Sequence, residues 1–154
     1  MKEQYRLVEN NDDDCQLSYM WWNDETTRKM SFNQSATTSY DEFRLFFKDK
    51  YFSNHVQPIY VCDESRPMCF IGFMSLKDTD AQLIGINMDP EYRGKHLGKH
   101  CLAIGIAYIK DKYPNVKKIH AEIKECNMPS IKVFEAFEFG YQLVDIYEKM
   151  DTKY

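Results

Sequence analysis

A short basic stretch with two glycines carries the clearest chemical signal in this sequence. Arg93, Gly94, Lys95, Gly98 and Lys99 lie between an apolar run and a long amphipathic run. That order predicts a strand, a tight turn and the start of a helix. The first backbone N–H groups of a helix have no partner within it, and the helix dipole makes that end positive. With the nearby cations they are suited to bind phosphate, and the glycines let the backbone approach it closely.

Candidate catalytic side chains follow on the neighbouring strands. Glu122 and His120 alternate on a predicted strand, so both point to one face. Either side chain can act as a general base. Glu122 also fits a solvated strand face paired with a lysine, and His120 also fits an ordinary surface histidine. Asn87, on the strand before the basic stretch, fits a substrate ligand or a residue that braces a bulge.

Residues 93–98 resemble the acetyl-CoA loop of the GCN5-related N-acetyltransferase (GNAT) superfamily, which reads Gln/Arg-x-x-Gly-x-Gly/Ala. Arg93, Leu97 and Gly98 match that pattern, whereas His96 stands where the middle glycine usually lies. Residues 120–139 are similar to the superfamily's closing segment. Asn127 and Ser130 match it there, whereas Phe134 and Glu138 replace the usual tyrosine and glycine.

This resemblance implies an acetyltransferase that uses acetyl-CoA as co-substrate, needs no metal, and holds the thioester carbonyl on a backbone N–H near Met88. In related protein N-terminal acetyltransferases, a glutamate at the position of Glu122 acts as general base. The family tyrosine often protonates the departing thiolate, which Phe134 cannot do. A thiol of pKa about 8.5 can leave unassisted, or water or another residue supplies the proton. The coenzyme residues that the resemblance implies are Ile86, Met88, Arg93, Gly94, Lys95, His96, Leu97, Gly98, Lys99, Asn127, Ser130 and Phe134.

The segment from Trp21 to Asn33 is similar to W-R-N-D-x-x-x-R-x-x-S-x-N, which recurs in N-acetyltransferases that act on nucleotide-linked amino sugars. It implies that Trp22, Asn23 and Arg28 bind the acceptor. The arginine would meet a diphosphate or carboxylate, and a tryptophan would stack on a ring. The alternatives are that Trp21 is a core residue and that Asn23 and its neighbour only cap a helix.

Two other functions remain open at this point. The first is a protein N-terminal acetyltransferase of the ribosomal-protein type, whose acidic site would suit a cationic peptide terminus. The second is an acyl-CoA-binding module without turnover, which the changes at His96 and Phe134 leave possible. An assay of amine acceptors separates these functions from transfer to an amino sugar.

The elements that must position these residues form one mixed α/β domain over 1–154, with acceptor-side helices in 1–55 and the acetyl-CoA-binding core in 81–140. We expect a mostly antiparallel central sheet, splayed at the coenzyme site and flanked by about four helices. Strands are predicted at 5–8, 59–62, 68–74, 81–88, 116–123 and, once or twice, within 141–150. Helices are predicted at 15–22, 40–49, 97–112 and from Pro129 onward.

Composition narrows the partners. The chain has 154 residues and a net charge of −4, which argues against nucleic acid. It has no apolar run of membrane-spanning length and no secretory signal pattern, so we expect a cytoplasmic protein without a membrane partner. Five cysteines without paired spacing indicate reduced thiols. The three aspartates at 12–14 predict a solvated loop or a helix cap. A small-molecule amine acceptor is the expected partner, and a homodimer is one oligomeric state open to the chain.

Overall fold

A six-stranded sheet with the order β1-β2-β3-β4-β5-β6 forms the centre of the molecule. The computed structural model describes residues 4–27, 39–75, 80–124, 128–135 and 144–149, with backbone only for 122–124 and 144–149. The strands are β1 (Tyr5–Leu7), β2 (Ile59–Asp63), β3 (Arg66–Ser75), β4 (Ala81–Met88), β5 (Lys118–Lys124) and β6 (Val144–Lys149). The helices are α1 (Asp12–Trp22), α3 (Tyr40–Tyr51), α4 (Gly98–Lys112), α5 (Met128–Glu135) and the short 3-10 helix η1 (Pro90–Tyr92).

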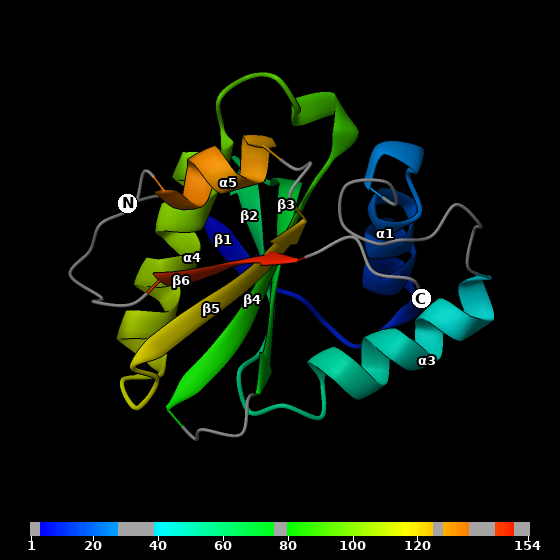
Figure 1. Ribbon diagram of the computed structural model, residues 1–154. Helices are drawn as coiled ribbons and strands as arrows, with labels where there is room; N and C mark the ends of the chain where they lie inside the picture. The colour runs from blue at the N-terminus through cyan, green and yellow to red at the C-terminus, as the bar shows by residue number, and fades with distance from the viewer. Residues whose placement is uncertain (1–3, 28–38, 76–79, 125–127, 136–143, 150–154) are drawn as a thin grey trace.

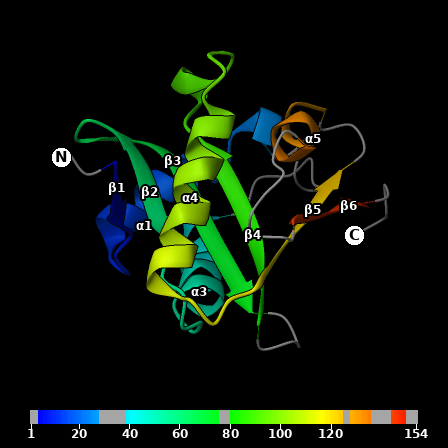
Figure 2. The same ribbon diagram turned by 90° about the vertical axis from the view of Figure 1, so that its left-hand side faces the viewer.

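Helices cover both faces of this sheet. Figure 1 shows α4 and α5 on one face and α1 and α3 on the other, and Figure 2 looks onto the face that α4 covers. Strands β1 to β4 pair antiparallel, whereas β4 with β5 and β5 with β6 pair parallel. The predicted mixed fold is therefore confirmed, including a parallel β4–α4–β5 unit at the basic stretch.

The core beneath α4 comes from the alternating residues of the strands. Ile71 and Phe73 of β3 and Ile84 of β4 point to this face and are fully or almost fully buried. They pack against the inner stripe of α4, which includes Leu102 and Ile109. Burying side chains of this size stabilises the fold by about 1.5–3 kcal/mol each. The apolar stripe of α4 is therefore a packing surface, as its spacing predicted.

The core beneath α1 and α3 is aromatic. Phe43 and Phe47 of α3 lie against Tyr60 and Phe70, which β2 and β3 direct to this face, and Trp21 of α1 joins them. The ring centroids of Trp21 and Tyr60 are 5.6 Å apart in an edge-to-face arrangement. Such aromatic pairs favour this geometry and add to the energy of burial. Trp21 is thus a core residue, which was one of the two interpretations of its position.

Asp14 fastens α1 to the sheet. Its carboxylate accepts hydrogen bonds of 3.0 and 2.9 Å from the Arg6 guanidinium and one of 2.8 Å from the Glu9 backbone N–H. The Tyr60 hydroxyl donates to the Asp14 carbonyl oxygen at 2.8 Å. The expectation of a solvated loop at residues 12–14 is therefore wrong. They form the first turn of α1, where acidic residues favour the helix dipole, and Asn11 caps that turn.

Two of the element boundaries that differ from the predicted ones have a visible cause. The β2–β3 turn is tighter than 63–67, because Glu64 adopts φ 57° and lets β3 begin at Arg66. Strand β5 begins two residues late, since the backbone N–H groups of Lys117 and Lys118 both donate to the Asp80 carbonyl oxygen. Ser39 caps α3, because its hydroxyl accepts from the Glu42 backbone N–H.

Candidate active site

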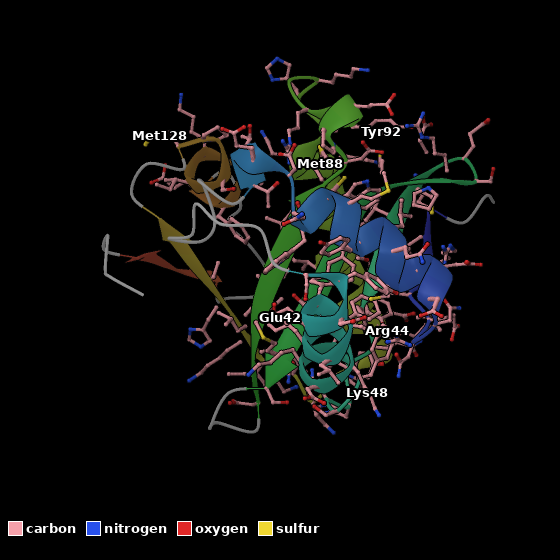
Figure 3. All side chains as sticks on the ribbon, turned by 90° about the vertical axis from the view of Figure 1, so that its right-hand side faces the viewer. Glu42, Arg44, Lys48, Met88, Tyr92 and Met128 are labelled. Atoms are coloured by element: carbon pink, nitrogen blue, oxygen red, sulfur yellow. The ribbon has the colours of Figure 1, made fainter. Side chains whose placement is uncertain are left out.

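The sheet opens between β4 and β5. Strand β4 pairs with β3 from Gln82 to Met88, but it pairs with β5 only from Ala81 to Leu83. Residues 84–88 of β4 therefore have a neighbouring strand on one side only. The predicted splay is confirmed, and it lies beside the basic stretch, at the end of the strand where Figure 3 labels Met88 and Tyr92.

Backbone groups of β4 face this opening. The Asp89 backbone N–H donates to the Met68 carbonyl oxygen at 2.9 Å, which continues the β3–β4 ladder. Because hydrogen-bonded pairs alternate along an antiparallel ladder, the N–H and C=O groups of Met88 and Ile86 point away from β3. Arg93 Nη2 lies 3.4 Å from the Met88 carbonyl oxygen on that side, which agrees with this direction. Both residues predicted from the resemblance thus present backbone donors at the opening.

The first turn of α4 has no side-chain cap. Leu97 occupies the cap position and makes no side-chain hydrogen bond, whereas Asn11 and Ser39 cap α1 and α3. The Cys101 backbone N–H donates to the Leu97 carbonyl oxygen at 3.0 Å, which is the first hydrogen bond of the helix. The preceding N–H groups at 98–100 are left as donors at the positive end of a 15-residue helix. Lys99 is exposed beside them, so the site fits an anionic group.

The loop before α4 takes the backbone path that glycine favours at two positions. Gly94 has φ 74° and His96 has φ 59°. His96 replaces the usual glycine of the resembling motif, yet it adopts a left-handed conformation, which histidine tolerates better than most residues do. Both it and Lys95 are exposed. The substitution at His96 therefore leaves this loop conformation intact.

Gly98 has a packing role that the sequence did not indicate. A Cβ atom built on Gly98 would lie 2.9 Å from Cγ2 of Val133, which belongs to α5. The missing side chain lets α5 pack closely on the start of α4. Of the predicted residues in α5, Ser130 lies in the first turn and is half-buried, and Phe134 is buried in the core beside Ile131.

Arg93 is the residue whose position departs most from the expectation. Its Nη1 lies 2.7 Å from Asp24 Oδ2, and its Nη2 lies 2.5 Å from Thr27 Oγ1. The guanidinium therefore contacts the turn after α1, in the part of the chain that the sequence predicts to be the acceptor side. Burial alone raises the pKa of the Asp24 carboxyl, but the hydrogen bonds from Arg93 and the Thr27 backbone outweigh it and lower that pKa. Asp24 is thus a weaker base than an ordinary carboxylate.

Tyr92 braces the loop from the opposite side. The Arg66 guanidinium lies 5.0 Å from the centre of its ring, and the Lys95 ammonium lies 5.7 Å from it. The Tyr92 hydroxyl donates to Asp63 Oδ2 at 3.2 Å, and Arg66 also bonds Glu91 at 3.1 Å. The β2–β3 hairpin therefore supports the basic loop through cation–π and charged contacts. Sequence reasoning missed this support, because its partners lie far apart in the chain.

The face of β4 toward α1 carries Asn87. Its partner Phe70 belongs to the aromatic core on that face, whereas Ile84, Ile86 and Met88 belong to the α4 side. Gly85 lies two residues before Asn87 on the same face, and among the described residues no neighbouring atom lies within 4 Å of the position a Cβ would take there. The described part of the chain therefore leaves this face of β4 open at Gly85.

An aromatic group flanks this face. Trp22 is half-buried, and its ring lies 5.1 Å from that of Phe43 and 5.9 Å from that of Phe46. Asn23 follows it as the C-cap of α1, with its backbone N–H on the Tyr19 carbonyl oxygen. The Asp24 side chain accepts from the Thr27 backbone N–H at 3.2 Å, so the capping role proposed for this segment is observed. Arg28 lies outside the described residues.

The predicted catalytic residues are only partly described. His120 is half-buried in β5 and pairs with Leu83, at the point where the two strands part. Glu122 lies two residues further along β5, and its side chain is outside the described part. Asn127 is also outside the described residues. Asn87 Oδ1 lies 3.5 Å from the Thr27 hydroxyl oxygen, so this predicted catalytic residue contacts the turn after α1.

Neither a metal centre nor a membrane span is present among the described residues. They contain no group of three or more His, Cys, Asp or Glu side chains placed to hold a metal ion. None of their helices has the length and apolar character that would let it cross a membrane.

Comparison with protein families gives a match over most of the chain. Residues 16–140 match the sequence family described as "Acetyltransferase (GNAT) family". A curated relative, the uncharacterized protein MJ1062 of Methanocaldococcus jannaschii, is 28% identical over 131 residues. That match covers 83% of this chain and 26% of the relative, so the chain spans about a quarter of the length of this protein.

Comparison with solved structures gives the same fold. An N-acetyltransferase from Staphylococcus aureus Mu50 has a TM-score of 0.70 and 21% identity, over 86% of this chain and 80% of the other. The enzyme AAC(6')-Ib in complex with ribostamycin and coenzyme A has a TM-score of 0.71 and 15% identity, over 88% and 81% of the two chains. These likenesses confirm the predicted mixed α/β architecture.

Proposed function

This chain belongs to the acetyltransferase (GNAT) family, and from that premise we propose that it is an acetyl-CoA-dependent N-acetyltransferase domain whose acceptor is a primary amine on a ring-bearing small molecule. The acceptor that we favour within this class is a nucleotide-linked amino sugar. One observation carries the choice of class, namely the open face of β4 at Gly85 and Asn87, flanked by the half-buried ring of Trp22. An aromatic side chain beside a shallow polar face suits a sugar or base ring.

The coenzyme is proposed to bind at the opening between β4 and β5. The uncapped N–H groups at 98–100 and the exposed Lys95 and Lys99 suit its phosphates. The backbone N–H of Met88 faces the opening and is suited to polarise the thioester carbonyl, because fixed donors at a developing oxyanion lower the barrier strongly. Acetyl-CoA supplies the activated acetyl group for the transfer.

The chain's own residues would then handle the amine. The amine nitrogen attacks the carbonyl carbon, the carbon–sulfur bond breaks, and the amine loses a proton. Glu122, with His120 as the second candidate, is proposed to take that proton, either directly or through water. Asp24 is less suited to this role because of its lowered pKa and its bond to Arg93. Phe134 has no proton to give and is buried, so a thiolate leaving without help from this position agrees with its surroundings.

Oxygen-rich amine substrates have a precedent among the structural neighbours. The enzyme AAC(6')-Ib holds ribostamycin together with coenzyme A in its solved complex. At 15% identity this likeness supports the fold, so it raises the interest of amino-sugar acceptors without assigning one. The protein N-terminal alternative rests on Glu122 alone, and the CoA-binding module rests on Phe134 and His96.

A screen of acceptors with a thiol-release assay tests the proposal. It should include UDP- and dTDP-linked 4-amino sugars, aminoglycosides and peptides with free N-termini. We expect acetyl-CoA consumption to depend on an amino sugar and to be greatest with a nucleotide-linked one. Turnover with peptides alone would replace this function with the N-terminal one. Tight coenzyme binding without any turnover would favour the binding module.

A further inference from the structure

The turn after α1 and the loop after β4 are tied together by three side chains, Asp24, Thr27 and Arg93, which we call the clasp. Arg93 Nη1 bonds Asp24 Oδ2 at 2.7 Å, and Arg93 Nη2 bonds Thr27 Oγ1 at 2.5 Å. The Asp24 and Arg93 side chains are 27% and 31% exposed, so water screens their attraction only in part. These contacts join residues 66 and 69 positions apart.

The clasp uses the arginine's donors on the acceptor side. Besides Asp24 and Thr27, Nη2 lies 3.4 Å from the Met88 carbonyl oxygen, at the mouth of the splay. A planar guanidinium cannot keep this geometry and also turn its fork toward the N-terminus of α4. Within the described residues, Lys99 is left as the exposed cation in the first turn of that helix.

The clasp also reaches Asn87. The Thr27 hydroxyl lies 3.4 Å from Asp24 Oδ2 and 3.5 Å from Asn87 Oδ1, so its single proton can serve either oxygen. The Arg93 guanidinium donates to the same hydroxyl oxygen. When the Thr27 hydroxyl donates to Asn87 Oδ1, it fixes the orientation of the Asn87 amide and therefore the direction of its NH₂ group. Arg93 thereby acts on the open face of β4 through Thr27.

We propose that Arg93 is a positioning residue for the acceptor rather than a ligand of the coenzyme phosphates, and that Asp24 and Thr27 hold it in that role. The proposal rests on the acceptor face assigned above. The clasp ties the turn after α1 to β4, because Thr27 contacts both Arg93 and Asn87. Loss of one member frees this turn to shift, and a shift of about 1 Å in a bound reactant can cost up to about 100-fold in rate.

The test compares Asp24→Asn, Arg93→Gln and the double variant. Asparagine keeps an oxygen that can accept from the Thr27 backbone N–H, so it removes the charge while leaving the helix cap. We expect kcat/KM for the acceptor to fall at least about tenfold in each single variant. The double variant should be no worse than either single one, because both remove one shared contact. The affinity for acetyl-CoA, measured by calorimetry, should stay within about threefold.

Control variants separate the clasp from general effects. Arg44→Gln removes the pair with Asp12 at 3.3 Å, which also links the helices of this face but lies outside the site, and it should leave kcat/KM unchanged. Lys99→Gln should weaken acetyl-CoA binding and flatten its dependence on salt, since fewer counterions are displaced. Arg93→Gln should leave that salt dependence unchanged.

Two outcomes would overturn the proposal. One is a salt dependence that flattens in Arg93→Gln as it does in Lys99→Gln, which would make the guanidinium a phosphate ligand. The other is unchanged kcat/KM in Asp24→Asn, which would make the pair structural only. If no amine in the acceptor screen is acetylated by the natural chain, the proposed function fails by itself. Two measurements without an acceptor then still decide whether the clasp exists. One is the salt dependence of acetyl-CoA binding, and the other is the amide hydrogen exchange of residues 24–27. Only the hydrogen exchange is expected to rise in both single variants.

Discussion

Replacement of Gly98 by alanine tests why α4 begins with a glycine. The new Cβ would lie 2.9 Å from Cγ2 of Val133, while carbon atoms pack best at about 3.5–4.0 Å. Helix α5 or the Val133 side chain must therefore withdraw by roughly 0.6 Å or more, and valine has few rotamers with which to do so. Overpacking of this kind costs about 1–3 kcal/mol. The better helix propensity of alanine offsets up to about 1 kcal/mol of that cost.

A double-mutant cycle with Val133→Ala isolates the collision. That variant removes both γ carbons and leaves Val133 Cβ at 3.9 Å, an ordinary contact. Gly98→Ala should therefore destabilise the natural chain but not the Val133→Ala chain. The coupling energy, measured by urea unfolding, should be about 1–3 kcal/mol, because helix propensity cancels in the cycle. A coupling below about 0.5 kcal/mol would refute this account of packing.

The natural chain, the two single variants and the double variant also show how Gly98 affects the affinity for acetyl-CoA. If α5 packing is its role, acetyl-CoA affinity falls in Gly98→Ala and returns in the double variant. If the Cβ instead blocks the ligand, as the sequence suggested, affinity stays low in both. Calorimetry on the four proteins distinguishes these results without an acceptor.

Four further perturbations have definite expected results. Burial raises the pKa of Asp14, but the hydrogen bonds from Arg6 and the Glu9 backbone outweigh it and lower that pKa. The charged Asp14 therefore stabilises the folded protein above the unfolded pKa of about 3.9, and this stabilisation is lost as the pH falls through the folded pKa. Asp14→Asn should accordingly reduce the free energy of unfolding at pH 7 and weaken its dependence on pH below about 4, as urea titrations would show. His96→Val should cost about 1–2 kcal/mol, because a β-branched residue resists the φ of 59° found there, and equal stability in thermal melts would count against that strain. Gly85→Val should fill the open face, raising KM for the acceptor but not for acetyl-CoA, and equal effects on both would remove Gly85 from the acceptor side. Glu122→Gln should lower kcat far more than it changes acetyl-CoA affinity, and a kcat unchanged from pH 6 to 9 would remove Glu122 from the mechanism.

Periodicity predicted the elements well because burial decides them locally. The strand predicted at 81–88 from its apolar run and the helix predicted at 97–112 from its apolar stripe correspond to β4 and α4 almost residue for residue. The splay between β4 and β5 was available only through the family resemblance, since no local pattern encodes the absence of a partner strand. The tight β2–β3 turn was missed because a positive φ at Glu64, unlike one at glycine, leaves no mark in the sequence.

The site was predictable in its backbone and less so in its side chains. An uncapped helix start after a basic turn follows from residue types alone, and the structure contains one at Gly98. The partner of Arg93 does not follow from residue types, because Asp24 lies 69 positions earlier in the chain. The spacing of Asp24 and Thr27 did carry a signal, since an aspartate three residues before a threonine favours a helix cap. That signal located the turn but not the arginine that reaches it.

The short seam between β4 and β5 has a mechanical consequence. Seven residue pairs join β3 to β4, whereas three join β4 to β5. The sheet therefore consists of two parts, β1–β4 and β5–β6, that are hydrogen-bonded to each other only at one end. Bending concentrates where the fewest hydrogen bonds resist it, and small rotations at Ala81–Leu83 widen or narrow the far end by leverage. A domain built this way can admit reactants of different thickness between β4 and β5, while the N-terminus of α4 stays fixed relative to β1–β4.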